Sequence, residues 1–92
     1  MPRSAREVTT ALLQKGFRKR HNDHAFFHLW VAGQKTPILT KVSHGEKEIG
    51  DGLLGRMARQ LRLTGKQFRE LIDCSLTGEQ LIRLLQDNGH IG

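Results

Sequence analysis

A chain of 92 residues with 37% hydrophobic and 26% charged residues suits one folded domain with a modest core, and this composition argues against a disordered protein. The single cysteine excludes an internal disulfide. The chain has no apolar run near the ~20 residues that span a bilayer, and its N-terminus lacks the apolar stretch of a signal peptide. We therefore expect a cytoplasmic protein without a membrane partner. The formal net charge of +6 lies entirely in residues 1–41, which indicates either a polyanionic partner such as nucleic acid or a solvated basic surface.

The first predicted element is a helix that begins after Ser4. Ser4 and Glu7 have the spacing of a capping box, in which each side chain accepts a hydrogen bond from the other residue's free backbone N–H. Apolar residues then recur at helical spacing, at Val8, Ala11 and Leu12. Gly16 is well placed to end the helix, because glycine takes the left-handed conformation at little steric cost.

Three strands are predicted next, over residues 17–20, 24–31 and 36–42. The middle strand alternates: one face is wholly apolar (Ala25, Phe27, Leu29 and Val31), and the other carries His24, Phe26, His28 and Trp30. Residues 21–23 and 32–34 have turn composition. Pro37 suggests an edge strand or a strand beginning, since proline cannot donate to the ladder.

Residues 43–52 are polar and rich in glycine, which predicts a loop, and the helical period returns from Leu53. One arc of this helix carries Leu53, Leu54, Met57, Ala58 and Leu61, and the opposite arc carries Arg56, Arg59 and Arg62. Such an arginine stripe is ordinarily a solvated helix face.

Two short helices are predicted at the end of the sequence. Residues 63–72 and 76–85 echo each other, and each begins with the Thr–Gln spacing of a capping box. The whole pattern predicts an α+β domain in the order α-β-β-β-α, with helices packed on a three-stranded antiparallel sheet and one or two added C-terminal helices.

The histidines of the middle strand have several interpretations. Imidazole both takes and gives a proton near neutral pH, as RNA cleavage requires at the 2′-hydroxyl and at the leaving 5′ oxygen. The same residues could instead be structural, or could bind a metal, although no convincing third ligand accompanies them and we predict no metal site and no cofactor. Phe26 and Trp30 could stack on bases, or could be core residues beneath a helix.

The order of short motifs resembles the HicA family (YcfA-like) of toxins from toxin–antitoxin pairs. Lys15-Gly16-Phe17 matches the family's "KGF", and Asn22-Asp23-His24 stands where "GSH" stands, with Phe27 at the aromatic position. Val42-Ser43-His44 matches "P-x-H" at the histidine but lacks the proline, and Gly52-Leu53-Leu54 stands at "GTL". Residues 61–68 are similar to the family's ending, so the resemblance covers about residues 4–72.

The resemblance implies a double-stranded-RNA-binding-domain-like (dsRBD-like) fold over residues 1–75, with residues 76–92 as a helical extension packed on it. It also implies an endoribonuclease that cleaves mRNA without a metal and is neutralised by a cognate HicB-like antitoxin. His24 is the implied catalytic residue, with His28 and His44 in reserve. The expected RNA-binding residues are basic and come from the first half of the chain: Lys15, Arg18, Lys19, Arg20 and Lys41.

Two other functions stay open at this point. The same fold and basic first half could bind RNA by shape and phosphate contacts without cleaving it. Alternatively, the added C-terminal helices could present an apolar face to a protein partner. Asn22 and Asp23 bear on this choice, because they replace the family's glycine and serine and place a negative charge beside the expected phosphate site.

Overall fold

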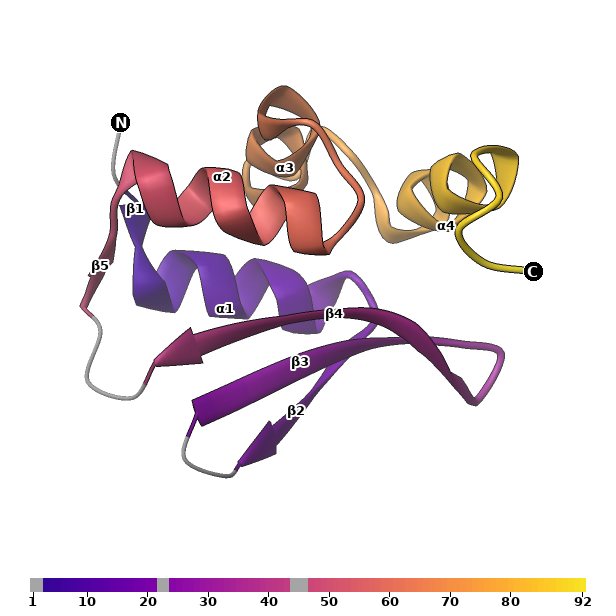
Figure 1. Cartoon of the computed structure of the whole chain (residues 1–92), viewed down its shortest axis with the longest axis horizontal. Helices are drawn as coiled ribbons and strands as arrows, with labels where there is room; N and C mark the ends of the chain where they lie inside the picture. The colour runs from indigo at the N-terminus through magenta and orange to yellow at the C-terminus, as the bar shows by residue number, and fades with distance from the viewer. Residues whose placement is uncertain (1–2, 22–23, 44–46) are drawn as a thin grey trace.

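The computed structural model of the chain describes residues 3–21, 24–43 and 47–92, with the main chain only at His21, His24 and Ser43. One three-stranded sheet forms the base, α1 and α2 cover one of its faces, and α3 packs on both of these helices (Figure 1). The α+β class with helices on one antiparallel sheet, predicted from the order of the sequence patterns, is confirmed.

The sheet has the order β2-β3-β4, formed by Phe17–His21, His24–Val31 and Gln34–Ser43, and both pairings are antiparallel. A two-residue turn joins β3 to β4, because Val31 pairs with Gln34. Ala32 and Gly33 both have positive φ, of 52° and 77°, as a type I′ hairpin turn requires.

A bulge interrupts the pairing of β3 with β4. Trp30 pairs with Lys35, whereas His28 pairs with Leu39, so two extra residues lie in β4 at this point. Pro37 falls within the bulge, where no ladder bond is lost, and the Thr36 hydroxyl donates to the Leu29 carbonyl at 2.8 Å. The predicted association of Pro37 with an edge strand is confirmed, since β4 lies at the edge of the sheet.

The helices are α1 (Ala5–Gln14), α2 (Asp51–Gln60), α3 (Gly65–Ile72) and α4 (Gly78–Asp87). Both predicted C-terminal capping boxes are present, with Thr64 paired to Gln67 and Thr77 to Gln80. The predicted box at α1 is half formed. Ser4 Oγ accepts from the Glu7 N–H at 3.0 Å, but the Glu7 carboxylate accepts from Arg3 at 3.3 Å instead. Gly16 takes φ +101° just after α1, as its expected role as a helix stop requires.

One prediction for the middle of the chain is wrong. Part of the expected loop over residues 43–52 forms a short strand, β5 (Glu48–Ile49), which pairs with β1 (Arg3–Ser4), and α2 begins at Asp51 rather than Leu53. A two-residue strand is too short to show alternation, and its partner lies more than forty residues away. Ile49 is fully buried, so this pairing closes the core near the start of α1.

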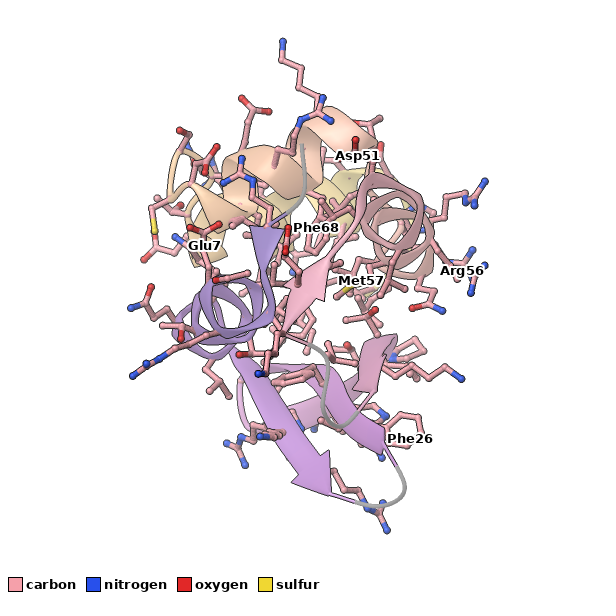
Figure 2. The ribbon with its side chains drawn as sticks, turned by 90° about the vertical axis from the view of Figure 1, so that its left-hand side faces the viewer. Glu7, Phe26, Asp51, Arg56, Met57 and Phe68 are labelled. Atoms are coloured by element: carbon pink, nitrogen blue, oxygen red, sulfur yellow. The ribbon has the colours of Figure 1, made fainter. Side chains whose placement is uncertain are left out.

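A single core lies between the sheet and the helices. Phe27 and Leu29 from β3 are fully buried, as are Met57 from α2 and Phe68 from α3 (Figure 2). α4 lies at the far end of the molecule from β1 and β5, and its Leu81 and Leu85 are fully buried in the same core (Figure 1). No helix in the described ranges is long and apolar enough to cross a bilayer.

Candidate nucleic-acid interface

The face of the sheet opposite the helices carries basic and aromatic side chains. Residues that pair across antiparallel strands point to the same side, and Arg18 pairs with His28 while Arg20 pairs with Phe26. Lys35 and Lys41 extend this side onto β4, opposite Trp30 and Phe26. We call this surface the open face; it consists of Arg18, Arg20, Phe26, His28, Trp30, Lys35, Leu39 and Lys41, all exposed or half-buried.

The alternation predicted for residues 24–31 is confirmed along the described side chains. Ala25, Phe27 and Leu29 are buried against the helices, and Val31 at the end of the strand is half-buried against the same core. On the other face, Phe26, His28 and Trp30 are each half-buried. No helix in the described part of the chain covers the open face (Figure 1). Half-buried aromatic rings on an uncovered sheet offer flat apolar surface beside cationic groups.

His28 lies in a shallow hollow at the centre of the open face. The hollow has a volume of about 260 Å³ and is lined by Arg20, Phe26, His28, Lys35 and Leu39. Partial burial lowers the pKa of His28 below its ordinary value of 6.5, and the positive charges of Lys35 and Arg20 lower this pKa further. The imidazole is therefore held in its neutral form at neutral pH, in surroundings that would attract an anion.

Arg18 stacks on Trp30. The guanidinium carbon lies 4.1 Å from the centroid of the indole ring, which is a cation–π contact. Arg18 is the Cα partner of His28, so the contact runs diagonally across β2 and β3. It positions the guanidinium close to the sheet, where a bound phosphate would meet it without prior ordering of the long side chain.

The predicted RNA-binding residues do not all share this surface. Arg18, Arg20 and Lys41 lie on the open face, whereas Lys19 pairs with the inward-facing Phe27 and so projects from the other side of β2. Lys15 is the C-cap of α1, and its carbonyl packs close to Gly78 at the start of α4: a Cβ added at Gly78 would lie 3.2 Å from the Lys15 oxygen.

The predicted catalytic residues are described to different extents. His24 begins β3, where its main chain pairs with Ser43, but its side chain lies outside the described residues. His44 and the Asn22-Asp23 pair at the family's "GS" position also lie outside them. Of the three candidate histidines, the described side chains therefore place His28 within the open face.

Sequence reasoning missed Lys35 and Leu39 as members of this surface. The signal lay in the Ala32-Gly33 turn: a two-residue hairpin loop sets Val31 opposite Gln34, and therefore Trp30 opposite Lys35. Leu39 comes opposite His28 only because of the bulge, whose size the sequence does not reveal.

The open face suits an anionic ligand with flat rings. Its lysines and arginines can neutralise phosphates, its aromatic rings can stack on bases, and its neutral imidazole can accept a proton. Among the described residues, no three His, Cys, Asp or Glu side chains cluster as they would around a metal ion.

Comparisons with known proteins add no relative to this picture. No family model, curated protein or solved structure matches the chain.

Proposed function

We propose that this protein is a HicA-like toxin: an endoribonuclease that binds single-stranded mRNA on the open face and cleaves it without a metal. The observation that carries the proposal is the alternation of cations with Phe26, His28 and Trp30 on an uncovered sheet. The order of the "KGF" and histidine motifs supports the same assignment, and with it a dsRBD-like arrangement of the first 75 residues.

RNA binding follows from the chemistry of the open face. Each cation that neutralises a phosphate releases condensed counterions, which favours binding at low salt. Phe26 and Trp30 are exposed enough to stack on bases that are not paired in a duplex, and such stacking tolerates any sequence. A single strand presents both groups at once, whereas an RNA helix hides its base faces.

Cleavage requires a base and an acid near one phosphate. The base removes the proton of the 2′-hydroxyl, whose oxygen then attacks phosphorus, while the acid protonates the 5′ oxygen as its bond to phosphorus breaks. The products are a 2′,3′-cyclic phosphate and a 5′-hydroxyl, and water is not consumed. Arg20 and Lys35 would stabilise the negative charge that develops on the phosphorane.

We assign the acid–base role to His24, with His28 as its neighbour on the same strand. Residues four apart on a strand are predicted to share a face, so we expect the side chain at position 24 to project from the same side of β3 as His28. The lowered pKa of His28 suits a base, which must be unprotonated at neutral pH. A cognate HicB-like antitoxin would neutralise the enzyme by covering the open face.

A second candidate is an RNA-binding module that does not cleave. Its support is the replacement of the family's glycine and serine by Asn22 and Asp23, since a carboxylate beside the scissile phosphate opposes the charge that cleavage develops there.

The two functions are separated by an RNA labelled at its 5′ end and a second RNA carrying 2′-methoxy groups. The nuclease cleaves the first and leaves a cyclic phosphate, and it binds the second without cutting it. The module retains both RNAs intact, and His24→Ala changes neither result. A chain that retains neither RNA would exclude both functions.

A further inference from the structure

A second basic surface lies beside the open face, between the edge strand β4 and helix α2. A pocket of about 450 Å³ opens there, lined by Pro37, Leu39, Arg56, Arg59, Gln60 and Arg62. Arg56 and Arg59 lie on the exposed arc of α2, and Arg62 follows the end of this helix. Figure 2 shows Arg56 of α2 projecting on the same side of the molecule as Phe26 of the sheet.

The three guanidiniums of this pocket have no protein counterion among the described residues. By contrast, Arg3 pairs with Glu7 at 3.3 Å and forms a two-pronged contact with Asp73, whose second bond is 3.0 Å. Three like charges around one pocket repel one another. An anion bound between them would relieve this repulsion.

The helix dipole explains only part of this arrangement. Cations in the last turn of a helix are stabilised by its negative end, and Arg59 is in that turn. Arg56 lies mid-helix, outside the reach of this effect.

The backbone of Arg62 has a left-handed conformation, in which glycine would be more stable than arginine. Arg62 has φ +62°, and its N–H bonds to the Arg59 carbonyl while Leu63 N–H bonds to the Ala58 carbonyl, which is a Schellman ending. Gly89 fills the equivalent position after α4, where glycine takes this conformation freely, whereas Cys74 fills it after α3 with φ +65°. An arginine is thus held in a left-handed conformation beside two other arginines.

Gln60 completes the pocket with an oriented amide. Its Oε1 accepts a hydrogen bond of 2.7 Å from the hydroxyl of Thr40, which is fully buried in β4. The acceptor side of the amide is therefore used by the sheet, and the donor side is left for a ligand.

We propose that this arginine pocket is a second phosphate site for the RNA that occupies the open face. Leu39 lines both the pocket and the hollow around His28, so the two sites meet across β4. The RNA backbone would run from the open face over the edge strand to α2, with Arg56, Arg59 and Arg62 on phosphates beyond the bases stacked on the sheet. This inference rests on the proposed RNA binding and extends it to further phosphates of the same strand.

The test uses the full chain and 5′-fluorescein-labelled oligouridylates of about 4 and about 16 nucleotides, a range that spans known single-strand sites. The pocket variant replaces Arg56, Arg59 and Arg62 by glutamine. The control variant replaces Arg6, Arg69 and Arg83 by glutamine, which removes the same charge from exposed positions that do not line the pocket. Affinity is measured by anisotropy over a range of salt concentrations, and circular dichroism confirms that each variant is folded.

For the long oligonucleotide, the pocket variant should lose at least about tenfold in affinity, the value of one charge-assisted hydrogen bond, and its log–log salt slope should fall by about 2. For the short oligonucleotide, which the open face accommodates alone, the two variants should bind equally. The pocket assignment is overturned, with RNA binding intact, if both variants bind the long oligonucleotide with the same affinity and slope. It is also overturned if the pocket variant weakens both lengths equally. Both the pocket and the proposed function fail if the unaltered chain binds neither oligonucleotide.

Discussion

Thr40 of β4 and Gln60 at the end of α2 are joined by a hydrogen bond of 2.7 Å between the hydroxyl and the amide oxygen. Thr40 is the one fully buried polar residue in the described part of the chain. Since a buried hydroxyl without a partner is costly, this bond fixes the last turn of α2 against the edge of the sheet. It thereby holds the arginines of α2 beside the open face.

Thr40→Val should lower the free energy of unfolding by about 1 kcal/mol, because the replacement keeps the size but removes the donor. Gln60→Leu removes the acceptor and should cost a similar amount. Urea unfolding of both single variants and of the double variant gives the coupling energy, which we expect to be about 0.5–1.5 kcal/mol. If the losses in unfolding free energy of the two single variants add up to that of the double variant, this bond does not fasten α2 to β4.

Arg20→Gln and Lys19→Gln remove one charge each from neighbouring positions of β2. Arg20 lies on the open face, whereas Lys19 projects from the other side of the strand. We expect Arg20→Gln to weaken RNA binding and to lower the salt slope by about 0.7, the contribution of one phosphate contact on a single strand. Lys19→Gln should leave both quantities unchanged, and equal effects of the two replacements would contradict the placement of the RNA.

His28 should make the fold less stable in mild acid. Its pKa in the folded protein is below the ordinary value of 6.5, so protonation favours the unfolded chain. The free energy of unfolding is therefore unaffected by protonation of His28 well above pH 6.5, and it decreases as the pH falls through 6.5 toward the lowered pKa. His28→Gln should therefore unfold with a weaker dependence on pH in this window than the unaltered protein. Identical pH profiles would show that neither burial nor the charges of Lys35 and Arg20 lower the pKa of this imidazole.

Arg62→Gly should raise the stability of the protein and weaken its binding to RNA. Glycine relieves the left-handed backbone, whose strain is on the order of 1 kcal/mol, and it removes one of three repelling charges. Arg62→Ala is the matched control, because it removes the same charge but keeps the strained conformation. Thermal unfolding should rank glycine above alanine, while the two variants should lose RNA affinity equally. A variant with glycine that is no more stable than alanine would contradict the account of the backbone.

Most of the fold was predictable because its signals are local. The alternation of residues 25–31 fixed which face of β3 enters the core, and the Thr–Gln pairs located the starts of α3 and α4. The β1–β5 pairing was not predictable, since two-residue strands carry no period and their contact is remote in sequence. Glu7 likewise had two partners within reach, and only the folded chain shows that it pairs with Arg3.

The candidate site was predictable in kind but not in extent. The basic run around Arg18 and the aromatic residues of β3 were visible in the sequence, whereas Lys35 joined them through a hairpin register and Leu39 through a bulge. The stripe of Arg56, Arg59 and Arg62 was visible in the sequence, but the charge balance of this half of the chain favoured its interpretation as a solvated helix face. Residues 42–92 carry seven cations and seven acids, but in space three of those cations line one pocket.

Cleavage of a 5′-labelled RNA by the His24→Ala protein, measured beside His28→Ala and the unaltered chain, tests the proposed enzyme most directly. General acid–base catalysis contributes about 10²–10⁴-fold in rate, so His24→Ala should cut at least ~100-fold more slowly while it binds RNA with unchanged affinity. The unaltered enzyme should work equally well in EDTA and should leave a 2′,3′-cyclic phosphate. A His24→Ala protein that cleaves at the unaltered rate, or activity that EDTA abolishes and a divalent ion restores, would contradict the account.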